Sequence, residues 1–264
     1  MKTIVITGST GGIGFGMADA FLARGCCVVI SGRTQERVDK AVSSLAEKHD
    51  LEWILSQACD VTDYAQVQTL WNAAVDRFGK VDMWVNNAGL PGAYQEFWTV
   101  DPAHMHAVVE TNLIGTMYGS KVAIEGMLAQ GFGAVYNMEG AGSTGRIHTN
   151  LIHYGSSKRG VNYLVKGLAE ELKGKPVIIG SLSPGMVVTE FYDMQRRSSP
   201  ESWERTKRVL NIIADKVETV APWLADRMLE NKKNGADISF ATRGKIMWRF
   251  LTAPFNKRDL FGEE

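Results

Sequence analysis

Near its start the chain carries Thr7-Gly8-Ser9-Thr10-Gly11-Gly12-Ile13-Gly14, preceded by the apolar run Ile4-Val5-Ile6 and followed by a helical pattern that begins near Ile13. This order predicts a strand, a tight glycine turn and the N-terminus of a helix. Glycines let the backbone approach a pyrophosphate, and the free N–H groups and dipole of the helix supply partial positive charge. The turn therefore predicts a dinucleotide site. It lacks the Gly-Lys-Ser/Thr ending of a triphosphate-binding loop, which argues against a kinase or NTPase.

Short β-branched runs alternate with segments of helical period along the rest of the chain. After Ile4–Ile6, the expected strands are Cys27–Ser31, Trp53–Gln57, Met83–Asn86, Ala134–Met138, Val177–Ser183 and Ile238–Ala241. Such alternation requires right-handed crossovers and a parallel sheet with helices on both faces. We therefore expect an α/β fold: a doubly wound (Rossmann) parallel seven-stranded sheet in a single domain over residues 1–264. Within it we expect a substrate lid at about 186–215 and a C-terminal tail at about 243–264.

Composition narrows the class of protein further. The 264 residues, 45% of them hydrophobic, can bury one large core, and Lys plus Arg equals Asp plus Glu at 29 each, so no overall charge favours nucleic acid or an anionic membrane. Cys26, Cys27 and Cys59 lack metal-ligand spacing, and we expect buried thiols with no metal and no disulfide. Because the N-terminus enters the first strand directly and no apolar run reaches about eighteen residues, we expect a cytoplasmic protein.

The end of the second strand predicts which dinucleotide binds. It is Ser31-Gly32-Arg33, with no Asp or Glu to bind a ribose diol. Arg33 can instead give a 2′-phosphate a charge-assisted contact. We expect NADPH/NADP+ in preference to NADH.

Further polar groups follow the later strands. Asp60-Val61 follows the third strand and Asn86-Asn87-Ala88-Gly89 the fourth, and Tyr154 stands four residues before Lys158 at the start of a long helical stretch. Residues four apart share one helix face, so the ammonium can act on the phenol. A neighbouring cation favours the anionic phenol, and we therefore expect the pKa of Tyr154 to fall below its usual value near 10.

Together with Asn112 and Pro184-Gly185-Thr189, these motifs resemble the short-chain dehydrogenase/reductase family over nearly the whole chain. By this resemblance the cofactor contacts are Gly8, Thr10, Gly12, Ile13 and Gly14 at the pyrophosphate, Asp60 and Val61 at the adenine, Asn87, Ala88 and Gly89 beside the ribose, and Thr189 at the nicotinamide carboxamide. The implied reaction is reduction of a carbonyl, with hydride from the nicotinamide and a proton from Tyr154. Lys158 would lower the pKa of Tyr154 and bind the nicotinamide ribose. Asn112 would kink a helix, so that its exposed backbone carbonyl anchors a water to Lys158.

One member of the family's catalytic set is missing. The family carries a serine about thirteen residues before the tyrosine, in a strand ending like Asn-Ile-Ser-Ser, whereas this chain has Asn137-Met138-Glu139-Gly140-Ala141-Gly142-Ser143. Either the loop is rearranged so that Ser143 polarises the substrate oxygen, or that donor is absent. We expect Ser143 to take the role.

The same departure resembles the chlorophyll(ide) b reductase branch of the family, which reduces a formyl group on a tetrapyrrole. The end of the chain, from Ile238 to Thr252, is also similar to that branch. A large apolar substrate would suit a lid rich in Met186, Phe191, Tyr192, Met194 and Trp203. Steroids, β-ketoacyl thioesters and small carbonyls remain alternative substrates. A protein of another class, an NADP(H)-binding sensor or scaffold with weak catalysis, is also open, although such a binder would not need the proton relay.

The tail mixes basic side chains with Met247, Trp248, Phe250, Leu251 and Phe255. Three uses are open: lying on a membrane as a basic amphipathic helix, covering the substrate cleft, or packing against protein. Because it lacks a clean polar face, we expect packing against the body or within a homo-oligomer, a dimer or tetramer, and no membrane contact. His104, His106, His148 and His153 show no ligand spacing, although His153 could touch substrate.

Overall fold

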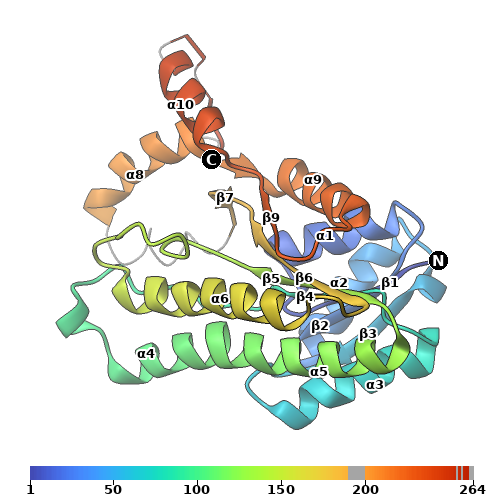
Figure 1. The fold of residues 1–264 in the computed structure, drawn as a ribbon. Coiled ribbons are helices and arrows are strands. Elements are labelled where there is room, and N and C mark those ends of the chain that lie inside the picture. Colours follow the sequence, from blue (N-terminus) through green and yellow to red (C-terminus); the bar gives the residue numbers. More distant parts are fainter. Residues whose placement is uncertain (190–199, 254, 257, 262–264) are drawn as a thin grey trace.

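Seven parallel strands form the central sheet, in the order β3-β2-β1-β4-β5-β6-β9, in a computed structural model that describes residues 1–189, 200–253, 255–256 and 258–261 (Figure 1). The sheet strands are β1 Thr3–Ile6, β2 Cys27–Gly32, β3 Ile54–Ala58, β4 Met83–Asn86, β5 Gly133–Met138, β6 Val177–Ser183 and β9 Ala236–Ser239. The predicted α/β class, doubly wound parallel sheet and number of strands are confirmed.

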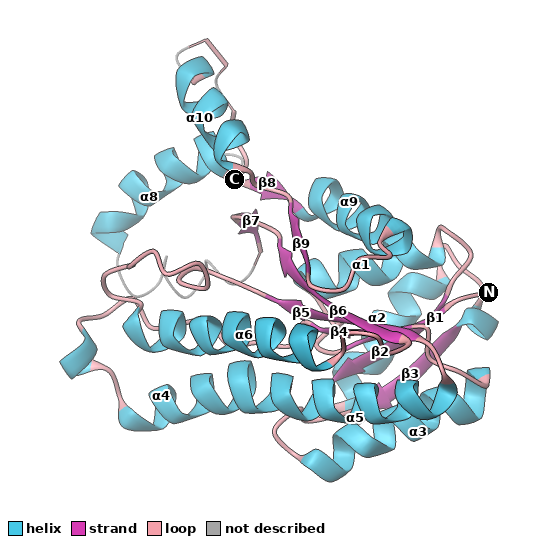
Figure 2. Ribbon diagram, viewed as in Figure 1, coloured by secondary structure: helices cyan, strands magenta, loops and turns pink. Residues whose placement is uncertain are grey.

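Helices connect the strands and cover the sheet (Figure 2). They are α1 Gly12–Leu22, α2 Gln35–Ala46, α3 Tyr64–Phe78, α4 Pro102–Val109, α5 Gly115–Gln130, α6 Ile152–Glu171, α8 Pro200–Ile213, α9 Val217–Glu230 and α10 Arg243–Thr252. Short 3-10 turns occupy Leu51–Trp53 (η1) and Phe97–Thr99 (η2), and a π-helical turn, η3 Glu110–Ile114, joins α4 to α5.

Alternate residues of each strand face opposite layers of helices, as the pleat requires. On β1, Ile4 and Ile6 pack with side chains of α1, α2 and α9, whereas Val5 packs with those of α3, α5 and α6. All three are fully buried, and so is Trp84 on β4. Burying such side chains stabilises the fold by about 1.5–3 kcal/mol each. Apolar side chains therefore pack against both faces of the sheet, and the polar groups lie at the carboxyl ends of its strands.

Five of the predicted strands differ from the observed ones by one or two residues at one or both ends, and the structure adds one small sheet. β3 begins at Ile54, not Trp53, because the side chain of Asp50 accepts a hydrogen bond from the Glu52 N–H and starts the turn η1. β9 lies two residues earlier than predicted. The two-residue strands β7 Val187–Val188 and β8 Asp215–Lys216 pair in a sheet of their own, and they are too short for a periodic pattern to reveal.

The C-terminal tail packs against the body on one side. The Arg249 guanidinium binds the buried Asp215 carboxylate through two contacts of 2.7 Å, and Trp203 of α8 packs edge-on against Phe261 with ring centroids 5.4 Å apart. The predicted packing against the body is thus present. A group of large apolar side chains nevertheless stays exposed, namely Met247, Trp248, Phe250, Leu251 and Phe255. The homo-oligomer remains a prediction.

The proposed lid lies partly beyond what the structure describes. Phe191, Tyr192 and Met194 fall in 190–199, outside the described residues, while Met186 is 38% exposed. Of the helices that the structure does describe, none combines the length and the apolar character needed to cross a bilayer.

Candidate active site

The glycine turn between β1 and α1 lies against the segment that follows β4. The Asn87 side-chain amide donates to the carbonyls of Thr7 and Gly8, both at 3.0 Å, and the Thr7 hydroxyl accepts the N–H groups of Asn87 and Ala88. Gly8 has φ +62°, and a Cβ there would come within 2.7 Å of the Ala88 Cα. The structure thus brings the predicted pyrophosphate and ribose residues together at one edge of the sheet.

Three further contacts suit this edge to a dinucleotide. A Cβ on Gly12 would lie 3.5 Å from the Thr189 methyl group, so the glycine turn and the residue predicted at the carboxamide are neighbours. The Thr10 side chain packs against Gly32 at the end of β2. The Ser31 hydroxyl is buried and lacks a hydrogen-bond partner among the described residues, while the exposed Arg33 follows it. A buried polar group without a partner is costly, and the 2′-side of a bound ribose would supply one.

Asp60 and Val61 follow β3 on the same edge. The Asp60 carboxylate accepts hydrogen bonds from the Thr62 N–H at 3.0 Å and the Thr62 hydroxyl at 2.8 Å, which fixes the turn. Val61 is buried and packs against Gly115 at the start of α5. Their role at the adenine stays a prediction.

Tyr154 and Lys158 lie on successive turns of α6, and both are buried. The Lys158 Nζ is 6.0 Å from the Tyr154 ring centroid and donates to the Met138 carbonyl at 3.0 Å. Burial lowers the pKa of Lys158 to about 8, although the charge of Glu139 opposes that shift. Burial, helped by nearby Tyr94, raises the pKa of Tyr154 above its usual value. This differs from the predicted fall, because desolvation of the buried phenol sets the direction of the shift.

Asn112 lies in the π-helical turn η3, as the kink implied by the motif requires. Its side chain accepts the Leu90 N–H at 2.7 Å and donates to the Leu90 carbonyl at 3.0 Å and to the Ser157 hydroxyl at 3.3 Å. Its backbone carbonyl accepts the Thr116 hydroxyl at 2.8 Å. The carbonyl that we expected to be exposed is therefore already engaged, and Asn112 ties the segment after β4 to α6.

The loop after β5 places Gly140 beneath the phenol. A Cβ on Gly140 would come within 2.3 Å of the Tyr154 Oη and 3.3 Å of the Lys158 Cγ. No hydroxyl stands at Gly140 or Ala141, where the family motif would place its serine. Ser143 lies one turn further along and is buried. Its N–H donates to the Gly140 carbonyl at 3.1 Å, and its carbonyl accepts from Arg159 at 2.8 Å.

Two site residues were missed by sequence reasoning. Tyr94, in the segment after β4, packs in one apolar cluster with Tyr154 and Ala141, and nothing in its sequence context signals this contact. Glu139 directly follows β5 and is buried, and a charge at the carboxyl end of a central strand was a signal that could have been used. His153 accepts the Ala93 N–H at 3.2 Å, so it supports the loop after β4.

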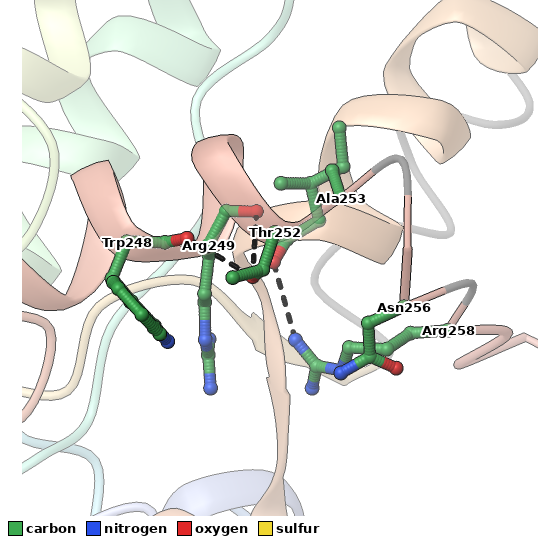
Figure 3. Close-up of a pocket in the computed structure, with 7 residues that line it drawn as sticks. Trp248, Arg249, Thr252, Ala253, Asn256 and Arg258 are labelled. Atoms are coloured by element: carbon green, nitrogen blue, oxygen red, sulfur yellow. Dashed lines mark hydrogen bonds between the residues drawn. The ribbon is translucent and has the colours of Figure 1, made fainter.

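A cavity of about 260 Å³ opens at the tail, lined by Ile212, Trp248, Arg249, Thr252, Ala253, Asn256 and Arg258 (Figure 3). It includes none of the predicted site residues. Its guanidinium groups are engaged, because Arg258 donates to the Ile212 carbonyl and both arginines bind Asp215. These contacts anchor the tail, and the glycine turn with Tyr154 and Lys158 marks the candidate active site instead.

The described residues offer no set of metal ligands. Among the described residues, no group of three or more His, Cys, Asp and Glu side chains is placed to hold an ion. Cys26, Cys27 and Cys59 are buried free thiols, and burial raises the pKa of each.

Comparison with known proteins agrees with the fold and the motifs. The short chain dehydrogenase family matches residues 2–200. The chain belongs to the short-chain dehydrogenase/reductase family of oxidoreductases, which bind nicotinamide cofactors. It is 37% identical over 226 residues to the chlorophyll(ide) b reductase NOL of Arabidopsis thaliana, covering 84% of this chain and 63% of the relative.

Two further comparisons extend this result. The chain is 33% identical over 279 residues to the probable chlorophyll(ide) b reductase NYC1 of Oryza sativa subsp. japonica, covering all of this chain and 54% of the relative. An actinorhodin polyketide ketoreductase solved with NADPH superposes with a TM-score of 0.81 at 25% identity, covering 91% of this chain and 95% of that one. The chain thus spans between about half and two thirds of the length of these plant relatives.

These relatives contradict the predicted location. Both plant enzymes are named as chloroplastic. The expectation of a cytoplasmic protein, which used the lack of an N-terminal targeting pattern and of a long apolar run, is therefore wrong.

Proposed function

We propose that the chain is an NADPH-dependent carbonyl reductase that acts on the formyl group of a chlorophyll b-type tetrapyrrole. The observation that carries the proposal is the convergence of Tyr154 and Lys158 with the glycine turn and the segment after β4 at one edge of the sheet. A Cβ on Gly89 would lie 3.8 Å from the Lys158 Nζ, so the ammonium faces the predicted ribose position. The names of the plant relatives support the substrate class.

The residues divide the work of the reduction. When bound, NADPH supplies a hydride to the carbonyl carbon. The Tyr154 phenol gives its proton to the carbonyl oxygen, which becomes the hydroxyl of the product alcohol, and the phenolate regains a proton from solvent. A protonated Lys158 would stabilise that phenolate and would donate to the nicotinamide ribose when the cofactor is bound. Burial raises the pKa of Tyr154, so the phenol is protonated near neutral pH and holds the proton that it would give to the carbonyl oxygen.

Ser143 is the proposed partner of the substrate oxygen. Position 140 has no hydroxyl and no room for a side chain beneath the phenol. The turn that carries Ser143 lies against the first turn of α6, since a Cβ on Gly142 would come within 2.6 Å of the Gly155 Cα. The turn that carries Ser143 therefore adjoins the helix that carries Tyr154.

A substrate panel tests the proposal. Purified protein is mixed with NADPH and, in parallel, with chlorophyllide b, a steroid ketone, a β-ketoacyl thioester and a small aldehyde, and nicotinamide absorbance is followed. We expect NADPH oxidation with the formyl tetrapyrrole, which becomes the hydroxymethyl product. Turnover with another of these carbonyls only would assign that carbonyl as the substrate instead. Binding of NADPH without turnover of any of the four compounds would favour the sensor or scaffold.

Arg33 is proposed to select NADPH. Its charge-assisted contact to a 2′-phosphate is worth about 1.5–3 kcal/mol. Arg33→Ala should therefore weaken NADPH binding about 10–100-fold and leave NADH binding unchanged. Equal losses for both cofactors would show that Arg33 does not bind the 2′-phosphate.

A further inference from the structure

Glu139 is a buried carboxylate at the carboxyl end of a central strand. It is 4% exposed, and its N–H donates to the Leu182 carbonyl of β6 at 2.9 Å, which extends the pairing of β5 and β6 by one residue. Glutamate is almost never fully buried unless it is paired. The chain must therefore offer this carboxylate both hydrogen bonds and a compensating charge.

Two neutral groups supply the hydrogen bonds. The Asn162 side-chain amide donates to one carboxylate oxygen at 2.7 Å, and the Ser183 hydroxyl donates to the other at 3.3 Å. Asn162 lies on α6 and Ser183 is the last residue of β6. These contacts fix the carboxylate between the helix and the sheet, but they do not neutralise it.

The geometry of α6 brings a buried cation to the same place. Lys158 precedes Asn162 by one helical turn, so the two share a face of α6. The Lys158 Nζ donates to the carbonyl of Met138, the residue directly before Glu139, and a Cβ on Gly140, directly after it, would touch the Lys158 Cγ. The backbone of residues 138–140 thus runs along Lys158, while the carboxylate of Glu139 itself reaches Asn162, one helical turn further along α6.

Among the described residues, the phenols of Tyr154 and Tyr94 and the side chain of Asn112 lie in the same site, and none of them is a carboxylate. On its own helix the phenol of Tyr154, and on the segment after β4 that of Tyr94, have pKa values raised by burial. From η3 and the segment after β4, Asn112 and Gly89 face it and do not titrate. The charge of Glu139 raises the pKa of Lys158 against the effect of burial.

We propose that Glu139 is a positioning residue, whose carboxylate is the counter-charge of the Lys158 ammonium and keeps that ammonium protonated at the edge of the candidate active site. Its importance for catalysis rests on the proposed reductase function, but the coupling of the two charges does not. Sequence motifs of the family gave no role to this position.

The coupling is measured on the ligand-free protein. Full-length protein carrying ¹³C-labelled lysine is titrated between pH 6 and 11, and the Lys158 Cε resonance is assigned by its loss in Lys158→Arg. Glu139→Gln keeps an oxygen and the shape of the side chain but removes the charge. We expect it to lower the Lys158 midpoint by about one pH unit, because the opposite charge that favours the ammonium is removed. Asp82→Asn, which removes a carboxylate at the amino edge of β4, should leave the midpoint unchanged.

Two outcomes would overturn the proposal. The first is a Lys158 midpoint in Glu139→Gln equal to that in Asp82→Asn. The second applies if Glu139→Gln does not fold and Glu139→Asp takes its place. The proposal is then refuted by a Lys158 midpoint in Glu139→Asp equal to that of the wild type, because the charge has been withdrawn by one methylene.

A separate measurement distinguishes this proposal from the proposed function. With NADPH and an accepted carbonyl, the alkaline limb of the kcat/KM profile should move to lower pH in Glu139→Gln, and Glu139→Asp should restore part of the difference. A shifted Lys158 midpoint in a protein that reduces no carbonyl would refute the function and leave the charge coupling intact.

Discussion

At the scale of single residues, Tyr154, Lys158 and Asn112 could be placed from sequence because their spacing and order along the chain are specific. The structure brings them to one edge of the sheet. The electrostatics could not be predicted in the same way. Burial, which depends on the whole fold, raises the pKa of Tyr154 although a cation lies close by. Gly140 was considered only as the lack of a serine, whereas its contact with the phenol shows why no side chain fits there.

Replacing Gly140 tests that contact. Gly140→Ala should destabilise the protein by about 1–3 kcal/mol through overpacking and lower the rate of carbonyl reduction, because the Tyr154 hydroxyl must move. The matched control is Gly167→Ala on α6, where a Cβ meets no atom within 4 Å. It should stabilise the helix by about 0.5–1 kcal/mol and leave the rate unchanged. Thermal unfolding and steady-state rates measure both; equal behaviour of the two variants would refute the close packing.

Ser143 can be tested directly as the donor to the substrate oxygen. Ser143→Ala should lower kcat about 10²–10³-fold, the cost of removing one such donor, while NADPH affinity stays the same. Ser43→Ala offers a comparison, since that hydroxyl is exposed on α2 and donates to the Asp39 carbonyl, and it should leave kcat unchanged. An unchanged kcat in Ser143→Ala would mean that the reaction proceeds without a serine donor.

At the scale of elements, the strands were predictable because each is a short apolar run with residues that face both layers of helices. Boundaries were not, because they depend on local capping such as that of Asp50 before β3. The π-helical turn at Asn112 was implied by the family motif alone. β7 and β8 could not be found, since two residues carry no period.

The turn between β1 and α1 supports a paired test. Gly8→Ala places a side chain at φ +62° and within 2.7 Å of Ala88, so it should lose about 1–2 kcal/mol from backbone strain alone and bind NADPH much more weakly. Gly11→Ala in the same turn has φ −173° and open space, and should keep both stability and affinity. Fluorescence titration with NADPH compares them, and equal affinities would argue that the cofactor does not lie on this turn.

At the scale of the whole molecule, the single domain and its parallel sheet followed from the alternation of strands and helices, while the path of the tail did not. Asp215 holds the tail through Arg249 and Arg258, and this long-range contact joins residues more than thirty positions apart. The location was predicted wrongly, because neither the fold nor its core determines where a protein is located.

We expect the ion pairs of Asp215 with Arg249 and Arg258 to stabilise the protein more than an exposed ion pair does. Asp215→Asn leaves two partly buried arginines without their carboxylate and should destabilise the packing of α10 on α8 by about 3–5 kcal/mol. Asp226→Asn, which breaks the exposed pair with Arg24, should cost less than about 1 kcal/mol. Hydrogen exchange of α10 reports the difference, and equal protection in both variants would show that Asp215 does not anchor the tail.

The central claim is that the Tyr154 phenol is the acid of an NADPH-dependent carbonyl reduction, and the most direct measurement compares single-turnover rates and NADPH affinity in the wild type and in Tyr154→Phe. Phenylalanine keeps the ring and its packing and removes only the hydroxyl. We predict a rate lower by about 10²–10⁴-fold, with the NADPH dissociation constant unchanged. A variant that reduces its carbonyl substrate at the wild-type rate would contradict the claim.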